Sequence, residues 1–365
     1  MLRFWIAAAL AAAAYWAGSA CAAAPAAPYR VGETMRKFHP ESPRHWRSAQ
    51  TQALTTTIWY PVDADLPEAP HDIGEPGRKT FRGHPLVDNA PLSAARAKYP
   101  LLLLSHGTGG TVDDQDWLAA ALAAQGYVVA GANHPGNNML EPLTRDGFQL
   151  WWERATDVSQ VLDGILADRE LGPRIDRDRI GAVGFSLGGY TVLELAGART
   201  NLPAFQRFCA SPDADAICHP PEMQHMQNDA TPVDAPSPET EASLARAGAS
   251  YRDTRIRAVF AMAPALGMAF DAASLADVRI PVALVAGTAD ITAPVETNVR
   301  RIAGFLPQAS LALLPGASHY TFLDTCLPPL VERLVNICKD GPGVDRNAVH
   351  AQVIERAGVF FSSTL

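Results

Sequence analysis

One pentapeptide, Gly184-Phe185-Ser186-Leu187-Gly188, constrains the fold of this chain more than any other stretch. It follows a short apolar run and precedes a segment with helical spacing, so it is expected at a tight turn from strand to helix. Small neighbours permit the strained backbone that such a turn imposes on a serine. Ser186 is therefore the predicted nucleophile, and the helix beginning at Leu187 would aim free backbone N–H groups at the atom it attacks.

Two later apolar runs end in residues that can complete a catalytic triad. Run 280–286 leads to Asp290, and run 311–314 leads to His319. Serine, then aspartate, then histidine is the chain order expected on an α/β-hydrolase sheet, and it differs from both common serine protease orders. We therefore predict Asp290 as the acid and His319 as the base, with Asp271 as the alternative acid.

A glycine-rich loop, Ser105-His106-Gly107-Thr108-Gly109-Gly110, follows the apolar run 99–105. Such a loop at the carboxyl end of a strand can bring backbone N–H groups close to a ligand. We predict that the N–H groups of Thr108 and Leu187 form an oxyanion hole and that His106 holds the loop. A plain strand-to-helix turn is the alternative.

Two other polar pairs in the sequence are expected to be structural. Arg154 and Asp157 lie on the helix predicted over 151–168, and we expect a surface or buried pair without a catalytic role. A metal site that uses His106 and His134 is disfavoured, because the chain lacks a ligand spacing such as His-Glu-x-x-His. No metal and no cofactor are predicted.

Strands and helices alternate along the chain, which places it in the α/β class. We predict an α/β-hydrolase fold with a mostly parallel central sheet, helices on both faces and an inserted lid. The domain is expected over 51–365, and the lid over about 201–253, where strand periodicity is lost and Met223, His225 and Met226 could line an acyl pocket. The predicted strands are 51–61, 99–105, 127–132, the run before Ser186, 256–263, 280–286 and 311–314; the predicted helices include 116–125 and 151–168.

The N-terminus predicts export. Arg3 precedes an apolar, alanine-rich run, and small residues follow it, as in a signal peptide over 1–22. Residues 23–50 would then be a tether, and the mature protein would be periplasmic or secreted with no stable membrane span. An uncleaved anchor and a lipid-anchored Cys21 are weaker alternatives, since Gly18 stands where a lipoprotein has a large aliphatic residue.

Removing Cys21 with the leader leaves four of the five cysteines. An even number in an exported chain favours two disulfides, and the local pairs Cys209 with Cys218 and Cys326 with Cys338 are the simplest of three connectivities. Free buried thiols are the alternative. Metal binding is disfavoured because no Cys-x-x-Cys occurs.

The composition fits a globular enzyme that acts on small or apolar molecules. Hydrophobic residues make up 48% of the chain and charged residues 19%, which excludes a disordered protein. The formal net charge is -8 and Lys and Arg form no run, so nucleic acid is not an expected partner. A small-molecule or lipid ester is the expected substrate.

These motifs together resemble exported bacterial α/β-hydrolases that are often labelled predicted dienelactone hydrolases and are similar to platelet-activating-factor acetylhydrolases. The resemblance covers roughly Thr51 to the C-terminus and matches Thr108 and Leu187 to the oxyanion pair. It rests on 105–110, 133–137, 184–189, 287–290 and 318–319. True dienelactone hydrolases use a cysteine in place of Ser186, so the label does not give the substrate.

From the predicted triad and this resemblance we expect an exported serine hydrolase that cleaves carboxylic esters through an acyl-enzyme on Ser186. The alternatives are a phospholipase-like deacylase, an acyltransferase, an amide hydrolase and, in another class, a hydrolase-like binding protein without turnover.

Overall fold

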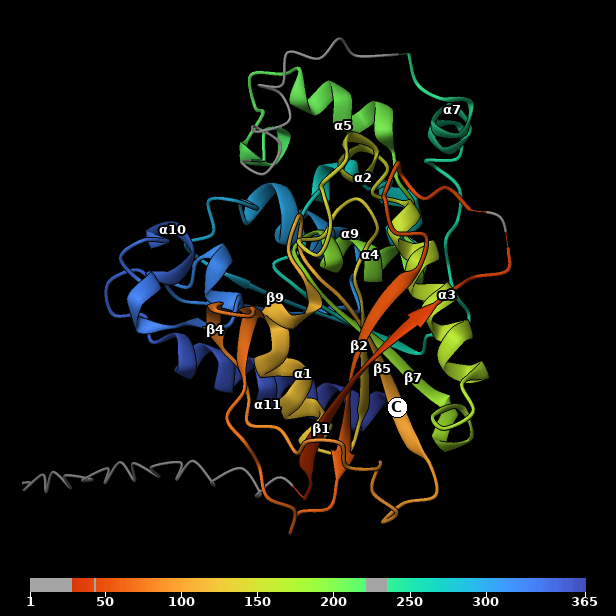
Figure 1. The fold of residues 1–365 in the computed structure, drawn as a ribbon. Coiled ribbons are helices and arrows are strands. Elements are labelled where there is room, and N and C mark those ends of the chain that lie inside the picture. The colour runs from red at the N-terminus through yellow and green to blue at the C-terminus, as the bar shows by residue number, and fades with distance from the viewer. Residues whose placement is uncertain (1–27, 43, 221–234) are drawn as a thin grey trace, which may run out of the picture.

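A large sheet runs through the centre of the molecule and carries helices on both faces (Figure 1). The computed structural model describes residues 28–42, 44–220 and 235–365. In these residues the sheet has the order β1-β2-β6-β5-β7-β8-β9-β10, and its strands are parallel from β6 to β10. The bounds are β1 Arg30–Phe38, β2 Leu54–Val62, β5 Tyr99–Ser105, β6 Val128–Ala132, β7 Ile175–Phe185, β8 Ala258–Met262, β9 Val282–Gly287 and β10 Ser310–Leu314.

Strand β5 shows how the sequence buries both faces of the sheet. Its four consecutive leucines are all buried, and alternate ones belong to opposite hydrophobic cores. Leu101 and Leu103 share a core with α3, α4, α8 and α9, whereas Leu102 and Leu104 share one with α1 and α11. The bounds are α1 Asp116–Ala124, α3 Glu153–Ala167, α4 Leu187–Ala196, α8 Ala272–Ala276, α9 Arg301–Phe305 and α11 Arg346–Thr364. This doubly covered sheet is the predicted α/β architecture.

The N-terminal region differs from the expected tether. Strand β1 lies within residues 23–50, and all nine of its residues pair antiparallel with β2. Only two of the nine residues of β1 are buried, so its mixed sequence did not indicate a strand. The segment that follows β1 also carries Arg47, whose side chain is fully buried.

The segment between β2 and β5 contains a hairpin. Strands β3 (Asp72–Glu75) and β4 (Arg78–Arg82) form a small antiparallel sheet with β11 (Thr325–Cys326). Ile73, Phe81 and Cys326 are buried together there. Cys326 is joined to Cys338 at the end of α10 (Val335–Cys338), with a Cα–Cα distance of 5.6 Å. This small sheet lies beside the carboxyl-terminal part of the fold (Figure 1).

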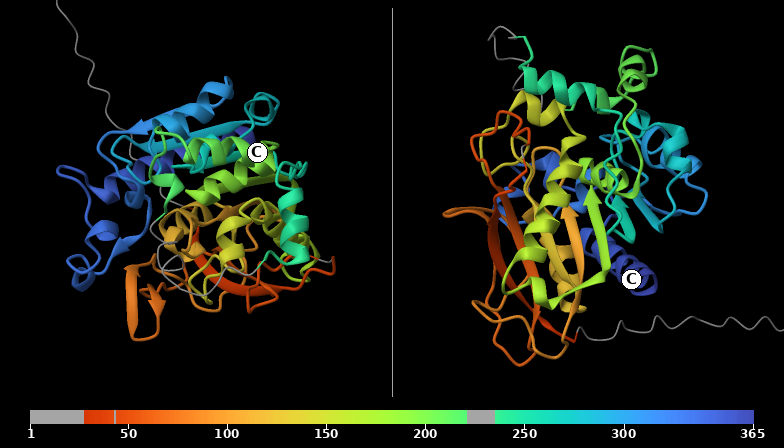
Figure 2. Two further views of the ribbon diagram at one scale, coloured as in Figure 1. Left: turned by 90° about the horizontal axis from the view of Figure 1, so that it is seen from above. Right: turned by 90° about the vertical axis from the view of Figure 1, so that its right-hand side faces the viewer.

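Three helices lie beyond the end of the sheet toward which β5 and β7 point (Figures 1 and 2). They are α2 (Arg145–Gln149), α5 (Leu202–Cys209) and α7 (Pro238–Ala245). Helices α5 and α7 belong to the segment predicted as a lid, and the first predicted disulfide joins Cys209 to Cys218 there, with a Cα–Cα distance of 5.5 Å. Both predicted disulfides are therefore confirmed.

Some predictions fall outside the described residues: the signal peptide over 1–22 with Cys21, and Met223, His225 and Met226. In the part of the chain that the structure describes, no helix combines the length and the apolar character needed to span a membrane.

Candidate active site

Ser186 lies at a sharp turn between β7 and α4. Its backbone has φ 55° and ψ −119°, a region that non-glycine residues rarely occupy and that costs free energy. A Cβ on Gly184 would lie 2.1 Å from the carbonyl oxygen of Gly188, and one on Gly188 would lie 1.8 Å from that of Ser105. The glycines are thus required at both positions. The Ser186 N–H donates to the carbonyl oxygen of Met262 at 2.9 Å, which ties the turn to β8.

The structure brings Ser186, His319 and Asp290 together. The His319 Nε2 atom lies 2.9 Å from Ser186 Oγ, and its Nδ1 atom lies 2.7 Å from Asp290 Oδ2. The other oxygen of Asp290 accepts hydrogen bonds from the N–H groups of Thr292 at 3.0 Å and Ala293 at 2.7 Å. With its carboxylate fixed on one side, Asp290 can hold His319 with Nε2 directed at the serine.

Asp271, the alternative acid, lies elsewhere. Its side chain caps α8 and accepts a hydrogen bond from the N–H of Ser274 at 2.8 Å.

The position of Asp290 depends on a close approach of two loops. A Cβ on Gly287 would lie 2.0 Å from the carbonyl oxygen of Ala317, so glycine lets the loop after β9 reach the loop that carries His319.

The glycine-rich loop after β5 lies beside the serine. A Cβ on Gly107 would be 3.3 Å from the Cβ of Ser186, and the N–H of Gly109 donates to Asn137 Oδ1 at 2.9 Å. Leu187 is the first residue of α4, and the first N–H groups of a helix have no partner within it. Thr108 and Leu187 both line the cavity at Ser186, so their backbone N–H groups are the candidates for the predicted oxyanion hole.

A cavity of about 910 Å³ opens over Ser186 and His319. Its walls come from three places: the β3–β4 hairpin, the predicted lid with the segment before α3, and the region near α10. The apolar side chains on them include Ile73 and Phe81, then Met139, Leu140, Phe148, Trp151, Phe205 and Ile217, then Leu323, Leu334 and Ile337. The cavity is large for a small-molecule site and mostly apolar.

Two of these walls were missed from the sequence. The hairpin is signalled by Pro76-Gly77, because such a dipeptide marks a tight turn. The α10 wall had no comparable signal: Leu334 and Ile337 line the cavity from a segment that the Cys326–Cys338 disulfide joins to β11. In the described ranges, no group of three or more His, Cys, Asp or Glu side chains is arranged to hold a metal ion.

The expected pair of Arg154 and Asp157 takes a different form. Asp157 is fully buried and forms ion pairs with Arg44 and Arg47 from the segment before β2. Arg154 donates instead to the carbonyl oxygen of His106. The two arginines that pair with Asp157 lie more than a hundred residues before it in the sequence, so helix spacing could not identify them.

Comparisons with known proteins point to hydrolases. A family model described as prolyl oligopeptidase family matches residues 113–207, and one described as platelet-activating factor acetylhydrolase, isoform II, matches residues 80–140. Hydrolase LUC6 from Fusarium sp is 30% identical over 172 residues, which are 46% of this chain and 39% of that protein. Lipase 1 from Moraxella sp. (strain TA144) is 33% identical over 88 residues, or 24% of each chain. The matches thus span well under half of these relatives.

A solved structure extends the likeness to nearly the whole chain. A ferulic acid esterase from Streptomyces cinnamoneus superposes with a TM-score of 0.59 at 20% identity, and the match covers 94% of this chain and 92% of that one. Together with the sheet order and the turn at Ser186, this likeness shows that the chain has the α/β-hydrolase fold.

Proposed function

We propose that this protein is an exported serine hydrolase that cleaves carboxylic esters through an acyl-enzyme on Ser186. The observation that carries the proposal is the hydrogen-bonded path from Asp290 through His319 to Ser186, which ends at a serine on the wall of an apolar cavity. The hydrolase relatives support the same reaction class.

In the first half-reaction, Ser186 Oγ attacks the ester carbonyl carbon while His319 Nε2 takes the hydroxyl proton. The carbonyl oxygen becomes an anion that the N–H groups of Thr108 and Leu187 stabilise. Asp290 holds the His319 Nδ1–H and stabilises the imidazolium. The intermediate then collapses, the bond to the alcohol oxygen breaks, and the alcohol leaves with the proton from His319.

In the second half-reaction, water enters where the alcohol left. His319 takes a proton from this water, whose oxygen attacks the acyl carbon. The same two N–H groups stabilise the second oxyanion, and its collapse returns the proton to Ser186 Oγ. The acid is released and the enzyme is regenerated without a cofactor.

The cavity favours esters with a large apolar group. Its volume of about 910 Å³ is near the upper end for small-molecule sites, and its walls offer aliphatic and aromatic side chains from three directions. A phospholipase-like deacylase fits the same cavity, and an acyltransferase would use the same acyl-enzyme with an acceptor other than water. The two disulfides support a location outside the cytoplasm, periplasmic or secreted, after removal of residues 1–22.

Amide hydrolysis is a second candidate, favoured by the match to the prolyl oligopeptidase family. The matched range 113–207 contains Ser186 but neither Asp290 nor His319, so it reflects the nucleophile turn and not the leaving group.

The test is hydrolysis of a p-nitrophenyl ester series from acetate to palmitate, with the matching p-nitroanilides and the Ser186→Ala variant as controls. We expect ester cleavage that persists or rises with chain length, anilide cleavage that is slower by orders of magnitude, and no turnover by Ser186→Ala. Faster cleavage of the anilides would identify an amidase. Absence of any turnover, together with failure of Ser186 to react with a fluorophosphonate, would indicate a binding protein.

A further inference from the structure

We propose that His106, which lies outside the catalytic triad, positions the oxyanion-hole N–H of Thr108. A fully buried hydrogen-bonded chain, Ser105–His134–Asp157, fixes the tautomer of the His106 ring that this role requires. This inference rests on the proposed function. It assigns His106 a positioning role and gives a purpose to the buried charges around Asp157.

The hydrogen bonds of His106 determine where its proton lies. The ring is fully buried, its Nε2 atom lies 3.1 Å from the backbone N of His134, and its Nδ1 atom lies 2.6 Å from the carbonyl oxygen of Gly107. A backbone N–H can only donate, so Nε2 must be the unprotonated nitrogen. The neutral ring then carries its hydrogen on Nδ1 and donates it to the oxygen of Gly107.

That oxygen belongs to the same peptide group as the N–H of Thr108. A peptide group is planar and its C=O and N–H point in opposite directions, so fixing the Gly107 oxygen also fixes the direction of the Thr108 N–H. A hydrogen bond to the carbonyl also polarises the group and strengthens the N–H as a donor. Because Gly107 adjoins Ser186, the donor is held beside the reacting atom.

Burial and charge keep His106 neutral. Burial lowers the pKa of His106 well below its usual value, and the positive charge of Arg154 lowers it further. Arg154 is itself fully buried and donates to the carbonyl oxygen of His106. Burial lowers the pKa of Arg154 to about 9, so the guanidinium stays charged at neutral pH. The peptide groups on both sides of Gly107 thus each have a fixed donor.

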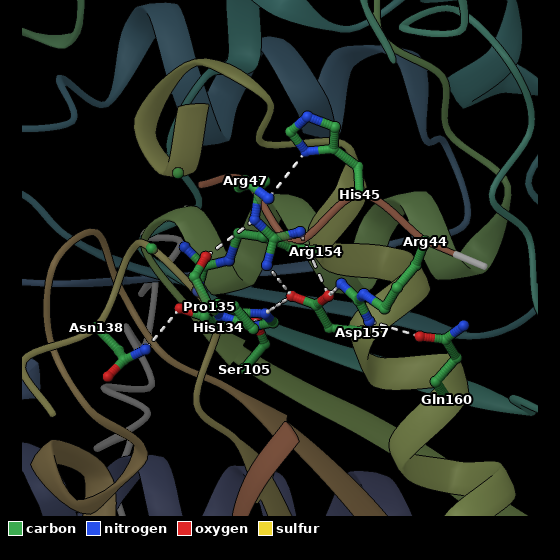
Figure 3. Close-up of polar contacts among 12 residues, drawn as sticks. Arg44, His45, Arg47, Ser105, His134, Pro135, Asn138, Arg154, Asp157 and Gln160 are labelled. Carbon is green, nitrogen blue, oxygen red and sulfur yellow. Dashed lines mark hydrogen bonds and ion pairs between the residues drawn. The ribbon is translucent and has the colours of Figure 1, made fainter. Parts of the chain in front are cut away.

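The buried Ser105–His134–Asp157 chain holds His134, whose backbone N–H sets the tautomer of His106. Figure 3 shows His134 together with Ser105 and Asp157. His134 Nδ1 lies 2.7 Å from Asp157 Oδ2, and its Nε2 lies 2.9 Å from Ser105 Oγ. Burial and Arg154 lower the pKa of His134 to about 3, so the neutral ring donates to Asp157 and accepts from the Ser105 hydroxyl.

Two arginines keep Asp157 ionised. Burial alone would raise the pKa of Asp157, but Arg44, Arg47 and His134 outweigh it and hold the pKa well below its usual value. Arg47 Nη2 lies 2.6 Å from Asp157 Oδ2, and Arg47 Nε also donates to the carbonyl oxygen of Pro135 at 3.0 Å. The segment before β2 therefore supports the loop that carries His134. Through His134 it also supports the glycine-rich loop 105–110, here called the oxyanion loop.

The test compares His106→Leu with His106→Asn. Leucine removes the donor to Gly107, whereas the asparagine amide can place an N–H near the former Nδ1 position. Enzyme concentration is set by fluorophosphonate titration run to completion, so misfolded protein is not counted. For His106→Leu we expect kcat/KM to fall about 10- to 100-fold, and an ester-like trifluoromethyl ketone, which forms an oxyanion on Ser186, to bind weaker by the same factor. KM should change little.

His106→Asn should retain most of the wild-type value for both quantities. Thr200→Val is the matched control, because it removes a buried hydroxyl that bonds Glu194 at 2.8 Å, away from the oxyanion loop. It should lower Tm and leave inhibition by the ketone unchanged. Unchanged inhibition of His106→Leu, or an Asn variant as impaired as the Leu variant, would overturn the proposal. A wild-type protein that neither turns over esters nor reacts with the fluorophosphonate would overturn the proposed function, and this inference with it.

A second measurement needs no variant. Long-range ¹H–¹⁵N correlation spectra of histidine-labelled protein should show His106 as the neutral Nδ1–H tautomer at every pH from about 5 to 9, since its pKa is held low. An Nε2–H tautomer, or an imidazolium within this range, would contradict the proposed hydrogen-bond path even if His106→Leu did not fold.

Discussion

Two Ser–His–Asp chains lie in this molecule with the same hydrogen-bond distances and different surroundings. In both, the serine oxygen lies 2.9 Å from Nε2 of the histidine, and the aspartate oxygen lies 2.7 Å from Nδ1. Ser186 belongs to one chain and lines the cavity. Ser105 belongs to the other and is fully buried at the end of β5. Matching distances alone therefore do not make a nucleophile.

The backbone and the acids explain the difference. Ser186 is presented by a strained turn at the start of a helix, whereas Ser105 is the last residue of a regular strand. Asp290 accepts hydrogen bonds from two backbone N–H groups, which orient it without adding a full charge. Asp157 is bound by two arginines, so its chain is fixed in one ionisation state. We infer that the first chain reacts and the second holds the loop.

Removing each serine gives the largest contrast. Ser186→Ala should lower kcat on a p-nitrophenyl ester by about 10⁴-fold or more and abolish labelling by a fluorophosphonate. Ser105→Ala should still be labelled and should lower the free energy of unfolding by about 1–3 kcal/mol, because Nε2 of His134 loses its donor in a buried site. Mass spectrometry of the labelled peptide checks the assignment, and a label on Ser105 would reverse the roles of the two chains.

Removing each acid charge separates catalysis from stability. Asp290→Asn should lower kcat by about 10⁴-fold while the fold remains, because His319 loses the acceptor that sets its tautomer. Asp157→Asn leaves Arg44 and Arg47 buried without a counter-charge and should cost about 3–5 kcal/mol of stability. Urea unfolding and steady-state kinetics on both variants check this. Equal stability losses, or a greater loss of kcat in Asp157→Asn, would contradict the division of roles.

The disulfides test how far the Ser186–His319–Asp290 chain depends on the segment 201–253, which was predicted as a lid. Replacing Cys209 and Cys218 by serine should loosen the segment over the cavity and cost about 2–3 kcal/mol or less. We expect faster proteolysis between residues 201 and 253 and a several-fold higher KM for long esters. The double variant at Cys326 and Cys338 serves as the matched control, since it affects the wall near α10 and not the segment 201–253. Unchanged proteolysis of the first variant would show that its disulfide does not restrain this segment.

A pH-dependent effect concerns Asp114, which follows the glycine-rich loop 105–110. Asp114 Oδ2 accepts the N–H of Thr111 at 2.8 Å, and burial raises the pKa of Asp114 to about 7. The folded state therefore holds this proton more tightly than the unfolded state does. This contribution makes stability greatest below about pH 4, and stability falls as pH rises to about 7, by at most ~1.4 kcal/mol per pH unit.

Asp114→Asn keeps the shape and removes the titration. Urea unfolding between pH 4 and 8 should show a flatter profile for this variant, with its advantage over wild type growing as pH rises. A profile parallel to that of wild type would mean that Asp114 does not titrate in this range.

The sequence predicted the features that short local patterns determine. Strand ends, the glycine pair around Ser186 and the chain order of Asp290 and His319 could all be read from short patterns, and the structure brings those three side chains together. It could not reveal the partners of Asp157, since a buried arginine has the same local pattern as an exposed one. The edge strand β1 was missed for a related reason, because its pairing with β2 and not its composition makes it a strand.

The ion pairs of Arg47 also bear on the order in which the chain becomes organised. Arg47 and Asp157 are separated by 110 residues, so an N-terminus that emerges first has no counter-charge for this arginine until α3 has followed. Contacts between such distant residues form late, because a long loop must close before they can stabilise anything. The oxyanion loop should therefore become rigid among the last steps of folding, and a nascent chain would reach hydrolytic competence only near its native state.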